Sequence, residues 1–349
     1  MFKEFSDKAI LTKVRARFGR RLTPAAYDEL CALGSVGEVC AYLQKQPNYS
    51  EVLAGIEPEK IHRGQLEAVL RRGVFTQYSG LVKFDFNGGI GFYRYIIIRR
   101  EVDQIITMLR LLSSGSPESY ILLLPGYLNR YTEFDLDALG HVRDFDGLLQ
   151  VLRRTPYYDI LKNRRPAEGS SEINLAGCEQ ALQSYYYKTV LGLIDEHFSG
   201  AVRSQLREMV LTQVDVRNIT YVYRLKRFFG AQQDEIRATL LPFDTPSRRV
   251  IERMTAAETP EELAEALAGC RYNSTGAVTT SSQPGYIEAL TDRGEYDLAM
   301  RNIRFSTSPA VVLVSYMTHL LQEFENITNA IEGIRYGLPR EEIRRMLIL

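Results

Sequence analysis

Three short stretches of the sequence carry acids and amides in the same order. Each has an acid, a polar or charged residue two positions on, an amide and an isoleucine: Glu101-x-Asp103-Gln104-Ile105, Asp215-x-Arg217-Asn218-Ile219 and Glu323-x-Glu325-Asn326-Ile327. Carboxylate and amide oxygens are the usual ligands of hard cations. The carboxylates of Asp103, Asp215 and Glu323 could therefore surround an opening and bind a cation. Asn218 and Asn326 would add amide oxygens to such a ring.

The same residues have a structural interpretation, which we favour over partner binding and over a metal site. A charge inside a protein must be paired, so the acids, amides and nearby arginines would tie neighbouring helices together. Arg110 and Arg224 each follow the acid of their stretch by nine residues, whereas the third stretch has Glu332 there. The candidate structural or interface residues are Arg15, Arg17, Glu101, Asp103, Gln104, Arg110, Asp215, Arg217, Asn218, Arg224, Glu323, Glu325 and Asn326.

Motifs for catalysis or cofactor binding are not found. The glycine cluster at residues 88–91 lacks the Gly-Lys-Ser/Thr of a phosphate-binding loop, and no H-E-x-x-H or G-x-S-x-G motif occurs. The four histidines are isolated and the four cysteines form no C-x-x-C pair, so we expect surface or helix-packing histidines and reduced thiols. The sequence predicts no catalytic, cofactor or metal site, and a helical-bundle enzyme is the least favoured interpretation.

The elements around these stretches also repeat. The acids that open the three stretches are 114 and 108 residues apart, a spacing that suits a small helical domain used three times. Between them lie helices that we expect to begin at Ser35, Asp144 and Thr259, three residues of the type that caps helix N-termini. Glycine follows each acid-bearing helix, at residues 115, 230 and 337, where it can adopt the left-handed conformation that ends a helix.

The order of these phrases predicts the domain organisation. Apolar residues recur at helical spacing and strict alternation is hard to find, so the fold class is all-α. The chain begins and ends in the middle of a repeat. We therefore expect a first unit at about 1–103, completed by the C-terminal segment, a second at 104–218 and a third at 219–349. The three would close into a funnel of pseudo-threefold symmetry.

Composition narrows the functional class. Lys plus Arg equals Asp plus Glu at 43 each among 349 residues, and a nucleic-acid-binding protein would more often carry a basic excess. The longest apolar runs are far shorter than the roughly 20 residues that cross a bilayer. The first residues are charged and lack the apolar core of a signal peptide. We expect a cytoplasmic protein that reaches a membrane only through a partner.

Four stretches resemble signatures of a stalk component of archaeal and bacterial A/V-type ATPases, the C-type subunit, whose eukaryotic counterpart is the d-type subunit. They are "VRARFGRRLTPAAYDELCALGSVGEVCAYLQKQPNYSEVL", "SYYYKTVL", "VDVRNITYVYRLKRFFG" and "EFENITNAIEGIRYGLPREEIRRML". The resemblance implies three helical domains in a funnel, without an active site. It implies a place on the cytoplasmic face of the membrane rotor ring, where the funnel receives the central shaft.

The resemblance also implies partners. These are the c/K-type ring subunits, the D- and F-type shaft subunits and, as a further contact, the membrane-embedded a/I-type subunit. The repeats depart from one another at Glu325, where the second copy has Arg217, and at Glu332. Which residues meet the shaft or the ring is therefore left open, as is the choice between protons and sodium ions. The alternative is a helical scaffold unrelated to the ATPase, which would have the same repeats but would not be part of a rotor.

Overall fold

The computed structural model describes residues 2–83, 89–167, 172–272 and 286–349. Over these ranges the chain is helical and has no strand, which confirms the all-α prediction. The helices of the first part are α1 (Phe2–Gly19), α2 (Pro24–Leu30), α3 (Val36–Gln44), α4 (Arg63–Val82), α5 (Gly89–Phe92), α6 (Tyr95–Ser113), α7 (Tyr120–Leu123), α8 (Leu136–Gly140), α9 (Phe145–Leu152) and α10 (Pro156–Leu161). The second part contains α11 (Leu175–His197), α12 (Gly200–Arg224), α13 (Gln233–Thr239), α14 (Arg248–Ala256), α15 (Pro260–Ala268), α16 (Tyr286–Phe305), α17 (Pro309–Arg335) and α18 (Arg340–Arg345).

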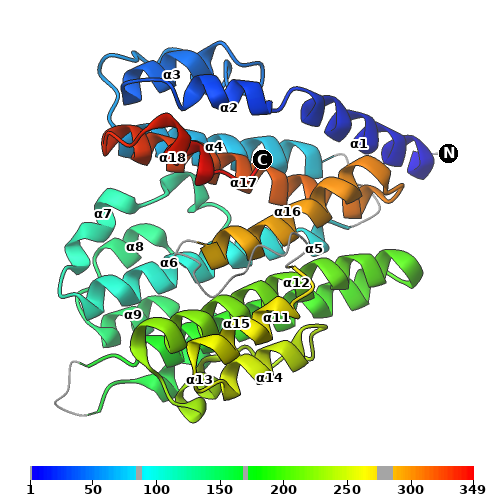
Figure 1. Cartoon of the computed structure of the whole chain (residues 1–349). Helices are drawn as coiled ribbons and strands as arrows, with labels where there is room; N and C mark the ends of the chain where they lie inside the picture. Colours follow the sequence, from blue (N-terminus) through cyan, green and yellow to red (C-terminus); the bar gives the residue numbers. More distant parts are fainter. Residues whose placement is uncertain (1, 84–88, 168–171, 273–285) are drawn as a thin grey trace. The chain divides into compact units, whose positions relative to one another are not determined.

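The chain divides into two compact units. Unit 1 comprises Met1–Ile90, Ser199–Met209 and Cys270–Leu349, and unit 2 comprises Gly91–Phe198 and Val210–Gly269. In unit 1, α17 packs against α1, α4 and α16, and α18 packs against α2 and α17 (Figure 1). The first and last segments of the chain thus share one unit. The division into three repeats and the closed funnel stay predictions.

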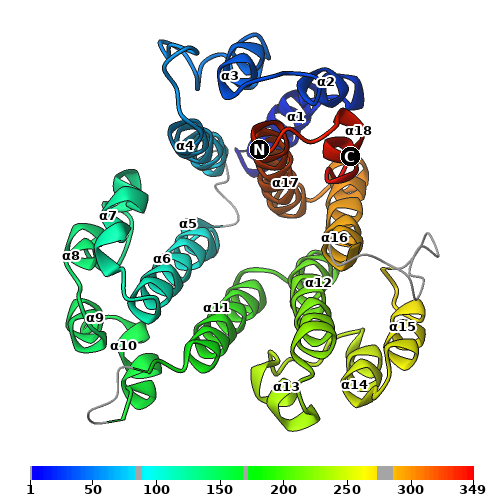
Figure 2. The same ribbon diagram turned by 60° about the vertical axis from the view of Figure 1, so that its left-hand side comes forward.

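Unit 2 is built around α6 and α11, which pack side by side (Figure 2). Shorter helices surround this pair: α10 and α13 lie against α11, and α14 packs against α15. Buried aliphatic side chains from both long helices form its core, among them Val102, Ile105, Leu182 and Ile194. No helix within the described ranges has the length and apolarity needed to cross a membrane.

The helices begin where their capping residues predict. The side-chain oxygens of Ser35, Asp144 and Thr259 accept hydrogen bonds from backbone N–H groups three residues on, at 3.2, 2.7 and 3.2 Å. These bonds satisfy N–H groups that have no partner within the helix. Glu38 of α3 also accepts a hydrogen bond from the N–H of Gly34, and the side chain of Ser116 makes no capping hydrogen bond before the 3₁₀ turn at Pro117–Ser119.

The helices also end as predicted, at glycines with positive φ. Gly115, Gly230 and Gly337 have φ of 72°, 58° and 66°, a region in which a side chain would be strained. The second copy has one more residue between its acid and its glycine than the other two copies. The chain accommodates this residue in a π-helical turn, Leu225–Phe229, at the end of α12. A π-turn absorbs a one-residue insertion without breaking the helix.

Gly333 of α17 provides a test of how closely α17 and α18 pack. A β-carbon at Gly333 would lie 2.6 Å from Cγ1 of the buried Ile343 on α18. We expect Gly333→Ala to lower the free energy of unfolding by about 1–3 kcal/mol, the usual cost of overpacking. Gly192→Ala on α11 is the control, because nothing lies within 4 Å of its added methyl group. It is expected to stabilise by about 0.5–1 kcal/mol. Urea unfolding followed by circular dichroism measures both, and equal effects would contradict the packing argument.

Candidate functional site

The first acid of each repeated stretch is buried. Glu101 is 1% exposed, Asp215 is 0% exposed and Glu323 is 2% exposed. A carboxylate removed from water needs donors to compensate for its lost hydration. In each copy the donor includes a backbone N–H of a loop that is distant in sequence. The acids therefore attach loops to the long helices that carry them.

In unit 2 the donors to Glu101 are a tyrosine and a loop. The hydroxyl of Tyr157 donates to Oε2 of Glu101 at 2.6 Å, and the N–H of Glu133 donates to Oε1 at 2.5 Å. Unit 1 repeats this arrangement around Glu323 of α17. There the hydroxyl of Tyr49 donates at 2.6 Å and the N–H of Leu22 at 3.1 Å.

The second copy uses the shorter acid Asp215. The N–H of Ser247 donates to Oδ2 of Asp215 at 3.3 Å. Neither Tyr49 nor Tyr157 is among the candidate residues named from the sequence. In the structure they are the partners of the repeated acids Glu323 and Glu101.

The amides of the repeats have an equally defined role. Asn218 accepts from the N–H of Leu241 at 2.9 Å and donates to the carbonyl of the same residue at 3.1 Å. Asn326 makes the same pair of bonds with Ile348, at 3.0 and 2.7 Å. Such two-bond pairing imitates a step of a β-ladder and holds a non-helical segment beside the helix. Gln104 differs in accepting from the hydroxyl of Tyr120 at 2.7 Å.

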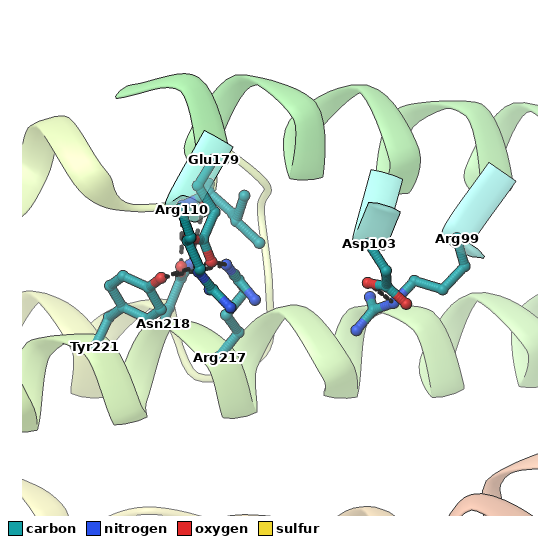
Figure 3. A network of polar contacts seen from close by, with 8 residues as sticks. Arg99, Asp103, Arg110, Glu179, Arg217, Asn218 and Tyr221 are labelled. Atoms are coloured by element: carbon teal, nitrogen blue, oxygen red, sulfur yellow. Dashed lines mark hydrogen bonds and ion pairs between the residues drawn. The ribbon is translucent and has the colours of Figure 1, made fainter. Parts of the chain in front are cut away.

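Asp103 does not take the place that the cation hypothesis required. Its carboxylate is partly exposed and lies 3.4 Å from Nε of Arg99 (Figure 3). The carboxylate also lies 3.5 Å from Nη1 of Arg100. The buried acid of that copy is Glu101, two residues earlier. Within the described residues, no group of three or more His, Cys, Asp or Glu side chains is arranged to hold a metal ion. The acids therefore meet backbone and tyrosine donors instead of one another.

Glu179 of α11 is the centre of a polar cluster in unit 2, and sequence reasoning missed it. Its carboxylate accepts from Arg217 at 2.6 Å, Arg110 at 3.1 Å and the hydroxyl of Tyr221 at 3.0 Å (Figure 3). Burial acts to raise the Glu179 pKa, but Arg217 and Arg110 outweigh it and the pKa is lowered. Glu179 is thus held as an anion that joins α6 and α12 to α11. A glutamate in an unrepeated phrase gave no sequence signal.

Unit 1 contains a cluster of the opposite polarity. Glu332 of α17 forms an ion pair with Arg63 of α4, and Nε of Arg63 also lies 2.5 Å from Glu67. Glu332 occupies the position, nine residues after the acid, at which α6 has Arg110. The third copy therefore also has an ion pair at this position, but the acid lies on the repeated helix α17 and the arginine lies on its neighbour α4.

The remaining candidates fall into two groups. Arg15 of α1 donates to the carbonyls of Ile303 and Ser306 at 3.1 and 2.7 Å, so its cation lies at the C-terminal end of α16. A positive charge there is favourable because carbonyls are unpaired at a helix C-terminus. Arg17 donates to the carbonyl of Gln77 at 2.9 Å, so both of these arginines are structural. Arg224 and Glu325 form the second group and lie at the surface.

His319 is a packing residue, one of the two roles that the sequence predicts for the histidines. It lies 2% exposed on α17. Its ring contacts the aromatic rings of Phe18, Tyr296 and Tyr316. Burial, with a smaller contribution from Arg21, lowers its pKa to about 3. The imidazole is therefore neutral at ordinary pH.

Tyr157→Phe tests whether the tyrosine–acid bond stabilises unit 2. The substitution removes the hydroxyl of residue 157 and leaves its buried ring in place. At pH 8, where the Glu101 carboxylate is ionised, we expect it to lower the free energy of unfolding by about 1.5–3 kcal/mol, the range for a hydrogen bond to a charged group. Tyr158→Phe is the control, since the neighbouring ring is only half-buried; it is expected to change stability by less than about 0.5 kcal/mol. Urea midpoints that match for the two variants would contradict this role.

Glu101 should also make stability depend on pH. Burial raises its pKa to about 7, against the opposing effects of Tyr157 and Arg94. Because the folded pKa lies above the unfolded one, the stabilising contribution is present below pH 4.5 and is lost as the pH rises through about 7. The stability of wild type relative to Glu101→Gln should therefore fall between pH 5 and pH 8, by roughly 2–3 kcal/mol.

Unfolding in urea at several pH values measures this difference. The constant effect of the amide cancels, because only the change with pH is compared. Asp103→Asn on the more exposed side of α6 is the matched control. A wild-type advantage that stays level or grows toward pH 8 would overturn the assignment.

Comparison with known proteins identifies the family to which this chain belongs. The family model described as "ATP synthase (C/AC39) subunit" matches residues 10–346. The chain is 24% identical to the C-type subunit of the A-type ATP synthase of Methanosarcina mazei, over 97% of this chain and 92% of that protein. It is 25% identical to that of Methanosarcina barkeri over the same shares, and 24% identical to that of Pyrococcus furiosus over 74% of this chain and 68% of that protein. This chain therefore belongs to the ATP synthase (C/AC39) subunit family, a family of non-catalytic subunits of the rotary complex.

Proposed function

We propose that this protein is the central-stalk component that couples rotation of the shaft to rotation of the membrane ring in an A-type ATP synthase. It would lie on the cytoplasmic face of the ring and serve as a socket for the end of the shaft. Membership in the family is the observation that carries the proposal, because the match extends from residue 10 to residue 346. The alternative scaffold outside the ATPase does not agree with that membership.

The buried ties support the proposal on physical grounds. A coupler must transmit torque without letting its helices slide against one another. The repeated acids on α6 and α17 each fasten a tyrosine and a loop N–H to a long helix. Leaving a buried donor or acceptor without its partner typically costs about 1–3 kcal/mol, which is more than most exposed ion pairs contribute, so these attachments resist shear better than exposed ion pairs do.

The proposed partners follow from the coupling role. They are the c/K-type ring subunits on one side, the D- and F-type shaft subunits on the other and, at the edge of the ring, the a/I-type subunit. The protein itself would catalyse nothing and need no cofactor. Membrane association would come from the ring, since no described helix can cross a membrane.

Affinity purification tests the proposal. A tagged copy of the full chain is expected to recover ring and shaft subunits in fixed ratio from gently solubilised membranes, as measured by quantitative mass spectrometry. An untagged strain and a tagged helical protein of similar size are the controls. Recovery of the a/I-type subunit and other stationary subunits, without ring or shaft, would overturn the central-stalk position and leave the family membership intact.

A further inference from the structure

The helices α6 and α17 bury the same face. Counted from the buried acid, positions one, four and eight residues further on are buried apolar residues in both helices. On α6 they are Val102, Ile105 and Leu109, and on α17 they are Phe324, Ile327 and Ile331. Apolar pattern alone therefore gives a folding chain little reason to prefer one partner helix over the other. A chain that repeats a helix risks pairing the wrong copies.

Position nine is where the two helices carry opposite charges. On α6 it is Arg110, which pairs with Glu179 of α11, an anion that also holds Arg217. On α17 it is Glu332, which pairs with Arg63 of α4. The two helix–helix contacts thus have opposite polarity: cation–anion–cation in unit 2, and anion–cation–anion, with Glu67, in unit 1.

This reversal penalises wrong pairing. If α17 packed against α11, Glu332 would face Glu179, which is only 8% exposed and would lose the arginine that α6 supplies. If α6 packed against α4, Arg110 would meet Arg63. A like-charge contact with a buried group is far more costly than one at an exposed surface, because water screens it less. Charged positions beside an apolar contact select helix partners in the same way in coiled coils.

We propose that the opposite charges at position nine of α6 and α17 determine which copy of the repeated helix pairs with which partner as the chain folds. The ion clusters then determine which helices pair, in addition to stabilising the pairs that form. The inference does not depend on the coupling role, since it concerns contacts within each unit.

Two variants of the full chain separate selection from stability. The reversed variant, Arg63→Glu with Glu67→Arg and Glu332→Arg, keeps attraction within unit 1 but gives it the polarity of unit 2. The neutral variant replaces the same three residues with glutamine, so attraction is lost and no wrong attraction is created. Each protein is unfolded in urea and diluted to refold. Size-exclusion chromatography measures the yield of monomer, and urea midpoints measure the stability of the monomer recovered.

We expect the ranking of the two variants by stability to be the reverse of their ranking by refolding yield. The reversed variant should be the more stable monomer and yet refold several-fold less efficiently than the neutral one, with the loss appearing as oligomers. The control exchanges the exposed pair Arg165 and Asp146, 2.7 Å apart in unit 2, and should refold like wild type. A reversed variant that refolds as well as or better than the neutral one would overturn the proposal. So would a reversed variant that is lower than the neutral one in both stability and yield, because simple damage explains that result.

Discussion

A carboxylate buried against the apolar face of a long helix is the constraint on which the rest of the structure depends. Once Glu101 or Glu323 has left water, it needs donors, and the chain supplies a tyrosine hydroxyl and a loop N–H at each site. Each bond brings a segment of irregular backbone to a fixed place on the helix. The amides Asn218 and Asn326 do the same for neighbouring segments. Helix packing supplies the bulk of the core, and these polar contacts determine where the loops lie.

The repeated helices are alike at their buried positions and differ in charge at the positions beside the buried face. The acid and the isoleucine are kept in type and burial, since they attach each helix to its own loops and core. The edge positions vary in charge, from Arg110 on α6 to Glu332 on α17. Repeated helices need both properties: alike interiors that pack in the same way, and edges whose charges distinguish α6 from α17.

Local signals in the sequence predicted the helices and their ends, because caps and left-handed glycines act through residues a few positions apart. The partners of the buried acids could not be predicted in this way. Tyr49 and Glu323 are 274 positions apart, and only the folded chain brings them together. Asp103 was chosen instead of Glu101 as a ligand for a related reason. Two acids two residues apart point roughly 200° from one another around a helix, and sequence does not say which of them faces inward.

The π-turn at the end of α12 shows where a repeated stretch is free to change in length. One additional residue is absorbed between Leu225 and Phe229, after the buried acid, amide and isoleucine of that copy, so none of them shifts in register. The cost is confined to the last turn, where Phe228 and Phe229 are 51% and 75% exposed. Insertions and deletions in the lineage of such a protein should therefore accumulate at helix ends. The three stretches can differ in length there while their buried acid, amide and isoleucine keep the same spacing.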